Sequence, residues 1–126
     1  ALECAACHVA YPPALLSAES WQRIMMGLSQ HYGVDASLDT AQIATIGQWL
    51  KSEAGTYKKV QISPPEDRIS RSSWFIREHR RVAPEVWRLA SVKSPSQCIA
   101  CHTQADQGRF DERDLRMPTG MKGGFR

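Results

Sequence analysis

Long apolar runs are missing from this sequence of 126 residues. No stretch approaches the roughly 20 apolar residues that a membrane-spanning helix requires, so we predict that the chain does not itself span a membrane. The alternation of strands and helices that marks a βαβ unit is also missing, and one short motif is the only internal repeat. These absences leave a small, mainly α-helical protein as the predicted fold class.

Cysteine is scarce, and its four copies all lie in that repeated motif. The sequence Cys-Ala-Ala-Cys-His covers residues 4–8, and Cys-Ile-Ala-Cys-His covers residues 98–102. Cys-x-x-Cys-His is the attachment signature of a c-type haem. Two thiols three residues apart lie on one side of a helical turn, where each adds across a haem vinyl group, and the histidine supplies an axial nitrogen. The sequence therefore predicts two covalently bound haem c groups, held by Cys4, Cys7, His8, Cys98, Cys101 and His102.

Histidine is equally scarce, since only two of the four histidines lie outside the motifs. These are His31 and His79, and each lies on an apolar helical face beside aromatic residues. Two irons with closed coordination each need one more strong ligand, so we predict bis-histidine coordination at both haems. The local assignment places His31 over the first haem and His79 over the second. A crossed assignment is the alternative.

A methionine ligand is the main competitor for the second iron. Met117 lies in a proline-containing segment downstream of His102, and a methionine in that kind of position ligates iron in many small cytochromes; Met121 is a second candidate. Bis-histidine ligation predicts lower reduction potentials than histidine–methionine ligation. Because a closed iron has no free position for oxygen or peroxide, the bis-histidine prediction favours electron transfer over catalysis.

Three other functions use similar residues. A structural zinc site uses pairs of cysteines, but here some ninety residues separate the two pairs and a histidine follows each. A thiol–disulfide enzyme uses Cys-x-x-Cys, although normally within a βαβ pattern. A haem enzyme of the peroxidase type needs an open iron, which the count of histidines argues against.

The apolar pattern predicts helices around the motifs. A stripe of apolar residues runs from Trp21 to Tyr32 and stops at Gly33, and Asp39 with Gln42 forms the start of a further helix that ends near Gly55. We interpret residues 56–68 as a connector. Helices are then predicted from Ser70 to Val82, over residues 84–89, and over residues 94–102, which include the second motif.

The predicted domains are two haem units of different regularity. Residues 1–57 are expected to form a small N-terminal helical unit similar to a cytochrome c, and residues 58–126 an irregular helical C-terminal unit with a loose tail after Gly120. Domains this small bury little apolar surface. We therefore expect each haem to act as part of the core, and the apoprotein to fold poorly.

Charge is distributed unevenly along the chain. Residues 1–57 hold two Lys/Arg and five Asp/Glu, a sum of −3, whereas residues 58–126 hold fourteen and eight, a sum of +6, which together give the net +3. One interpretation is that the arginines pair with haem propionates or lie in solvent. The other is that the C-terminal half docks an acidic redox-partner protein, because such patches steer association. No nucleic-acid partner is predicted.

The location follows from the motif. The sequence begins three residues before the first cysteine and shows no secretion signal. Because a c-type haem is attached outside the cytoplasm, we expect a periplasmic protein from which a signal peptide has been removed.

Several segments resemble the small dihaem cytochromes c of purple and related proteobacteria. They are the motif at residues 4–8, the segment Trp21–Gly33 that ends in His31-Tyr32-Gly33, the turn Asp35–Leu38, and Ser73-Trp74-Phe75 leading to His79. The resemblance implies a periplasmic electron carrier, expected as a monomer, with two bis-histidine haems. It also implies an N-terminal part similar to a class I cytochrome c and a more irregular C-terminal haem domain.

The resemblance also implies redox partners. In that family electrons arrive from a membrane cytochrome b and pass to an oxygen-binding monohaem cytochrome called sphaeroides haem protein. The small dihaem subunit of periplasmic nitrate reductase is the nearest rival, and it is also bis-histidine.

Overall fold

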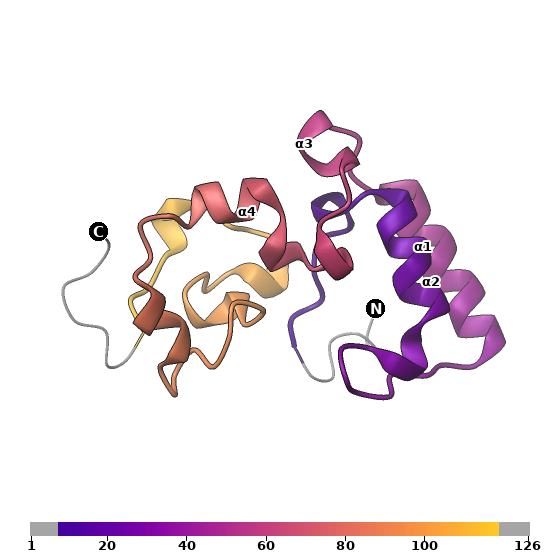
Figure 1. Cartoon of the computed structure of the whole chain (residues 1–126), viewed down its shortest axis with the longest axis horizontal. Helices are drawn as coiled ribbons and strands as arrows, with labels where there is room; N and C mark the ends of the chain where they lie inside the picture. The colour runs from indigo at the N-terminus through magenta and orange to yellow at the C-terminus, as the bar shows by residue number, and fades with distance from the viewer. Residues whose placement is uncertain (1–7, 119–126) are drawn as a thin grey trace. The chain divides into compact units, whose positions relative to one another are not determined.

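The computed structural model describes residues 8–118, and these residues are mainly helical (Figure 1). The α-helices are α1 (Ala18–Met26), α2 (Thr40–Glu53), α3 (Lys58–Gln61) and α4 (Ser73–Glu78). Short 3-10 helices fill the remainder, at Pro13–Leu15, Leu28–Gln30, Pro65–Asp67, Ile69–Arg71, Pro84–Arg88, Cys98–Ala100, Ala105–Gln107 and Glu112–Asp114. Among the described residues, β-structure is limited to two isolated bridges.

The described residues form two compact units, and the division falls within α4. One unit is residues 13–74, and the other is residues 8–12 together with residues 75–118. The two haem domains that the sequence predicts, residues 1–57 and residues 58–126, stay a prediction. The expected loose tail after Gly120 lies outside the described residues.

Helix α1 begins with a side-chain cap and buries one stripe. The Ser17 hydroxyl accepts a hydrogen bond from the Ser20 backbone N–H at 3.2 Å, which satisfies one free donor of the first turn. Trp21 and Met25 are buried. The helix ends at Gly27 and continues as a 3-10 turn, so the stripe expected to reach Tyr32 stops earlier. Glycine weakens a helix interior, and this explains the break.

Helix α2 has the capping box that the sequence predicts. The Asp39 carboxylate accepts from the Gln42 N–H at 2.8 Å, and the Gln42 side chain accepts from the Asp39 N–H at 3.3 Å. Ile46 and Leu50 are buried, and α2 packs along α1 (Figure 1). After α2, a side chain at Gly55 would collide with the Ala14 carbonyl, so glycine there allows the chain to pass closely.

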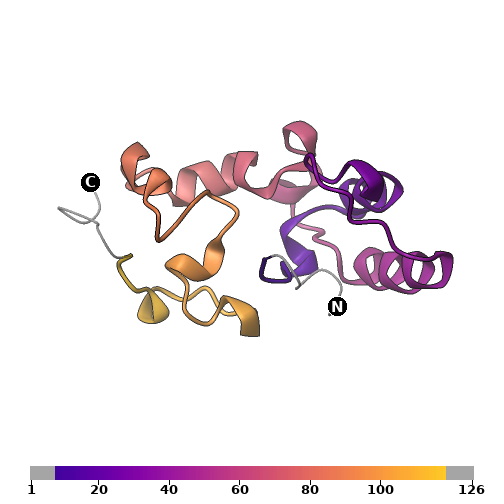
Figure 2. The same cartoon turned by 90° about the horizontal axis from the view of Figure 1, so that it is seen from below.

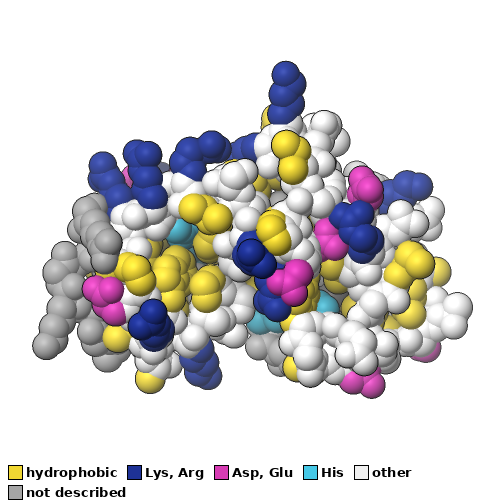
Figure 3. Space-filling view, in the orientation of Figure 1, with side chains coloured by type: hydrophobic (Ala, Val, Ile, Leu, Met, Phe, Trp, Pro, Cys, Tyr) yellow, Lys and Arg dark blue, Asp and Glu magenta, His cyan; other side chains and the backbone are white. Residues whose placement is uncertain are grey.

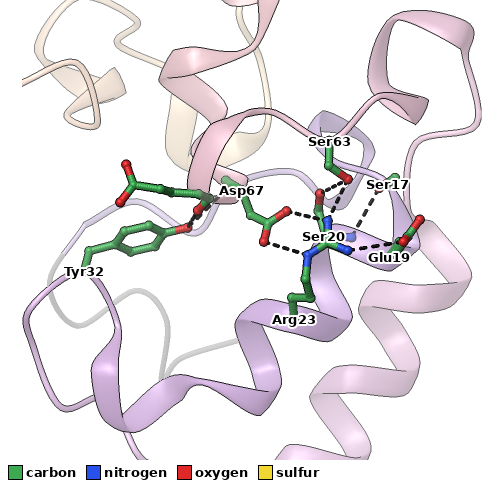
Figure 4. A network of polar contacts seen from close by, with 8 residues as sticks. Ser17, Glu19, Ser20, Arg23, Tyr32, Ser63 and Asp67 are labelled. Carbon is green, nitrogen blue, oxygen red and sulfur yellow. Dashed lines mark hydrogen bonds and ion pairs between the residues drawn. The ribbon is translucent and has the colours of Figure 1, made fainter.

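The segment after α3 is tied to α1 by polar contacts (Figure 4). Arg23 donates two hydrogen bonds to the Asp67 carboxylate, at 2.8 and 3.0 Å, and one to the Ser63 hydroxyl at 2.7 Å. It also pairs with Glu19 at 3.2 Å on its own helix. Arg23 holds the pKa of Asp67 below its ordinary value through these hydrogen bonds. The connector expected at 56–68 is therefore an ordered part of this unit.

The Arg23–Asp67 pair predicts a pH-dependent contribution to stability. Because folding lowers the pKa of Asp67, the pair stabilises above the unfolded pKa of about 4, and that stabilisation is lost as pH falls through the lowered value. Asp67→Asn is expected to lower the thermal midpoint by a few degrees at pH 7, and progressively less in acid. Glu53→Gln removes an exposed charge from the same unit as a control. Equal shifts for both variants at pH 7 would contradict the prediction.

The second unit has a small apolar core. Its buried apolar side chains are Phe75, Ala83, Val86, Val92 and Ala105. Two of these are alanines, and the segments after α4 are mainly loops and single turns (Figure 2). A core of this size is weak support for about fifty residues, so this unit has the greater need for a bound apolar group.

Candidate haem sites

The second motif folds as a 3-10 turn over Cys98–Ala100, and not as the expected α-helix. The Cys101 N–H donates to the Cys98 carbonyl at 3.3 Å, and the His102 N–H donates to the same oxygen at 2.9 Å. In a 3-10 helix the side chains at i and i+3 eclipse one another. Cys98 and Cys101 therefore share one side of the turn, which is the arrangement that the motif predicts for attachment to one ring.

Backbone pairing fixes the residue that follows this turn. His102 forms an isolated antiparallel bridge with Leu115. The Thr103 N–H donates to the Asp114 carbonyl at 3.2 Å, and the Arg116 N–H donates to the Cys101 carbonyl at 2.8 Å. The segment before Met117 thus holds the backbone of His102 in place. The Met117 side chain itself is 47% exposed.

His79 lies at the end of α4 with one ring nitrogen engaged. Its Nδ1 is 2.8 Å from the Phe75 carbonyl oxygen, one helical turn earlier, and the two rings stack with centroids 3.9 Å apart. A carbonyl only accepts, so Nδ1 carries the proton, and the Nε2 lone pair is left available to a metal. Sequence spacing predicts this contact, because residues i and i+4 share a helix face.

The structure brings His79 and His102 together within one unit. Their ring centroids are 6.2 Å apart, and the ring planes cross at 78°. Burial, and then the charge of His79, lower the pKa of His102, which favours its neutral form. Its Nδ1 is buried and has no hydrogen-bond partner among the described residues. The neutral form of His102 is the one that binds metals, and the hydrogen bond at Nδ1 of His79 leaves the other nitrogen of that ring facing away from its own helix turn.

The first motif is described only from its histidine onward, because Cys4 and Cys7 lie outside the described residues. The His8 ring stacks on Tyr11, with centroids 4.5 Å apart. The Tyr11 hydroxyl donates to the Ser96 carbonyl at 2.6 Å, two residues before Cys98. The end of the first motif and the start of the second are thus linked through Tyr11.

His31 lies in the other unit, at the start of a tight turn. Its carbonyl accepts from the Val34 N–H at 3.0 Å, and the two residues between them have positive φ, 50° at Tyr32 and 87° at Gly33. This is the backbone of a type I′ turn, in which glycine is favoured and tyrosine is not. His31 and Tyr32 line an open hollow of about 440 Å³.

Tyr32 is held in its strained conformation by the loop at residues 64–68. Its hydroxyl donates to the carbonyls of Glu66 at 2.9 Å and Asp67 at 3.2 Å (Figure 4). The Arg68 guanidinium lies 4.4 Å from the centroid of the tyrosine ring. These contacts offset the cost of a left-handed tyrosine, and they fix the backbone on which His31 is carried.

The family model for dihaem cytochrome c matches residues 1–110 of the chain. The chain belongs to the dihaem cytochrome c family. The cytochrome is also similar to a solved diheme cytochrome c of Shewanella baltica OS155, with a TM-score of 0.82 and 36% identity over 94% of this chain and 89% of that one. Two structures of the diheme cytochrome c of Rhodobacter sphaeroides give TM-scores of 0.75 and 0.76, at 42% identity over 86% of this chain and 92% of theirs. No curated protein matches.

The family confirms the predicted cofactors, two haem c groups, and implies electron transfer. The mainly helical prediction of the fold is also confirmed. No helix among residues 8–118 of the cytochrome is long and apolar enough to cross a membrane.

The spacing of His79 and His102 fits a haem iron between them. A histidine nitrogen lies about 2 Å from the metal that it binds, and about 1 Å from the centre of its own ring. Imidazoles on opposite sides of one metal therefore have centroids about 6 Å apart, and the observed separation is 6.2 Å. Because Nδ1 of His79 is hydrogen-bonded, its other nitrogen is the available ligand atom.

The thiol–disulfide interpretation of the motif finds less support in the cytochrome. A catalytic Cys-x-x-Cys thiol has a lowered pKa, whereas burial raises the pKa of Cys98 and of Cys101. Among residues 8–118, no three His, Cys, Asp or Glu side chains gather as a metal-binding group.

Tyr11 and Tyr32 are the two site residues that the sequence did not single out. Tyr32 and Gly33 together are only a weak turn signal. Helix periodicity predicts Tyr32 on the apolar stripe instead. The link from Tyr11 to Ser96 joins residues 85 positions apart. Contacts of this range leave no local pattern in one sequence.

Proposed function

We propose that the cytochrome is a periplasmic electron carrier whose two haem irons are both closed by histidine pairs. The observation that carries this proposal is the facing of His79 and His102 at 6.2 Å. In the proposal, the cysteines of each motif attach one haem and four histidines ligate the irons. The attachment residues are Cys4, Cys7, Cys98 and Cys101, and the ligands are His8, His31, His79 and His102.

Each haem supplies one reversible one-electron step at its iron, and the protein supplies the surroundings. The hydrogen bond from His79 to the Phe75 carbonyl orients its ring and makes the imidazole a stronger donor. The bridge between His102 and Leu115 holds the backbone that carries the other ring. If both histidines bound the iron, its coordination would stay the same in both oxidation states, which would suit rapid electron transfer.

For the first haem, the local assignment pairs His8 with His31. What supports His31 is that it lines a hollow of about 440 Å³, on a turn held by Tyr32. Supporting a ligand is a reason for the fold to keep a strained tyrosine there. The N-terminal and C-terminal haem domains are proposed to be the segments that provide each pair, 1–57 and 58–126.

Tyr32→Phe tests the role of this turn. Loss of the two hydrogen bonds to the 64–68 loop is expected to cost about 1 kcal/mol. That cost corresponds to roughly fivefold faster replacement of His31 by added cyanide at one ferric haem. Tyr57→Phe, at a tyrosine that is 73% exposed, is the matched control. Stopped-flow absorbance measures the rate at which cyanide replaces His31. An unchanged rate in Tyr32→Phe would contradict the proposed role of this turn in holding His31.

The proposed donors and acceptors are redox proteins. We propose a membrane cytochrome b as donor and an oxygen-binding monohaem cytochrome as acceptor; a role as the electron-transfer subunit of a periplasmic reductase is the alternative. Reduction kinetics with each purified candidate separate them. The true partner is expected to react faster than the others at physiological salt.

Carbon monoxide separates a carrier from a haem enzyme. With both irons closed, the spectrum of the reduced holoprotein is expected to stay unchanged under carbon monoxide at neutral pH. A stoichiometric carbon monoxide complex at either haem would show an open or labile iron and would contradict the proposal. Myoglobin, an open haem protein, serves as the positive control in a separate cuvette under the same conditions.

A further inference from the structure

Helix α4 has two chemically different faces. Phe75 and His79, one turn apart, lie on the inward face, where Phe75 is buried and His79 approaches His102. Arg77 lies on the opposite side by helical spacing, and Arg80 follows one turn after Ile76. All three of these outward residues are exposed. Helix α4 and the turn that follows it therefore carry a proposed iron ligand on one side and a basic surface on the other.

The basic surface consists of Ile76, Arg77, Arg80 and Arg81. Figure 3 shows the Lys and Arg side chains that gather along the edge above α4 and the turn after it. No ion pair within residues 8–118 engages these three arginines, whereas Arg23, Arg68, Arg71, Arg109 and Arg113 all have carboxylate partners. The acids nearest in sequence are Glu78 and Glu85, so the surface has a positive excess.

The composition of this surface fits a protein partner. Ile76 contributes an apolar side chain that is 58% exposed, and protein interfaces commonly combine apolar contacts with charged residues around them. Arginine binds carboxylates through two parallel hydrogen bonds and is favoured at such interfaces. Binding to anionic lipid typically uses clusters of about four to eight Lys/Arg, more than this surface provides.

We propose that the basic surface is the docking site for an acidic redox protein, which exchanges electrons with the haem held by His79 and His102. The proposal deepens the proposed function and rests on it. Docking here places the partner one helix diameter, about 10 Å, from the inward face of α4. Charge attraction increases the rate of encounter, and the exposed isoleucine adds an apolar contact.

The test uses the holoprotein and reduced flavodoxin, a small and strongly acidic electron donor, as the probe. The second-order rate of haem reduction is measured by stopped flow at about 0.01 M and about 1 M salt, where the screening length falls from about 30 to about 3 Å. Arg77→Gln with Arg80→Gln is expected to lower the rate about tenfold at low salt and hardly at all at high salt. Arg77→Lys with Arg80→Lys keeps the charge and is expected to retain most of the rate.

The matched control is Lys51→Gln with Lys58→Gln, which removes the same net charge from exposed positions in the other unit. An equal loss of rate in both double variants would mean that the effect comes from net charge alone. An unchanged rate in the arginine variant would mean that the basic surface is not the docking site. Sedimentation with phosphatidylglycerol vesicles that depends on Arg77 and Arg80, together with an unchanged flavodoxin rate, would assign the surface to a membrane. Each of these three outcomes overturns the proposal. Low-spin spectra that stay intact in the variants show that the failure concerns docking and not the haem ligands.

Discussion

His79→Met is expected to raise the reduction potential of one haem by on the order of 100 mV and to leave the other haem nearly unchanged. The physical reason is the ligand. A thioether is a poorer donor than an imidazole and favours the ferrous iron, and the side chain at position 79 faces His102. The measurement is a potentiometric titration followed by visible spectroscopy. A methionine–iron band in the far red of the ferric protein is expected to accompany the shift.

Ile76→Met is the matched control, because it places a methionine on the outward face of the same helix, 58% exposed. It is expected to move neither potential appreciably. If His79→Met shifted the potential of the haem attached next to His8, the crossed assignment would replace the local one. If neither haem changed, His79 would not be a ligand at all.

Cys98→Ala with Cys101→Ala is expected to remove one haem and with it the fold of residues 84–118. The buried apolar side chains of this unit are Phe75, Ala83, Val86, Val92 and Ala105, and little regular helix surrounds them. Without a large apolar ring in the centre, burial of such residues does not offset the cost of ordering the chain. The loss is expected to be complete in this unit and small in α1 and α2.

Hydrogen exchange followed residue by residue measures this effect. In the structure the Val92 N–H donates to the Leu89 carbonyl at 2.9 Å, and the Ala105 N–H donates to the His102 carbonyl at 3.0 Å. Both amides are expected to lose protection in the double cysteine variant, while amides of α2 retain it. Ile99→Ala, between the two cysteines, is the control that leaves the attachment intact. Native protection of both amides in the variant would show that the unit does not need its haem.

The parts of the fold that the sequence predicts well are those with local causes. The capping box of Asp39 and Gln42 depends on residues three apart, and the structure contains it. The contact of His79 with Phe75 follows from helical spacing. The cofactor is similarly local, because five adjacent residues are enough to predict each haem attachment.

The parts of the structure that differ from the sequence prediction depend on contacts between residues far apart in the chain. The second motif forms a 3-10 turn because its backbone also pairs with residues 114–116. Tyr32, expected on an apolar stripe, lies instead in a strained turn, since its hydroxyl is held by residues 66 and 67. A single sequence carries no local signal of either contact, so their effect on His102 and His31 appears only in the structure.

Low-temperature electron paramagnetic resonance of the ferric holoprotein tests the central claim most directly. The account predicts two low-spin signals and no high-spin signal of comparable intensity. One of the two should be strongly anisotropic, because imidazole planes that cross at 78° leave two iron orbitals close in energy. The methionine–iron band should be absent from the far-red spectrum of the same sample. A high-spin signal equivalent to one haem, or that band at full intensity, would contradict two irons closed by histidine.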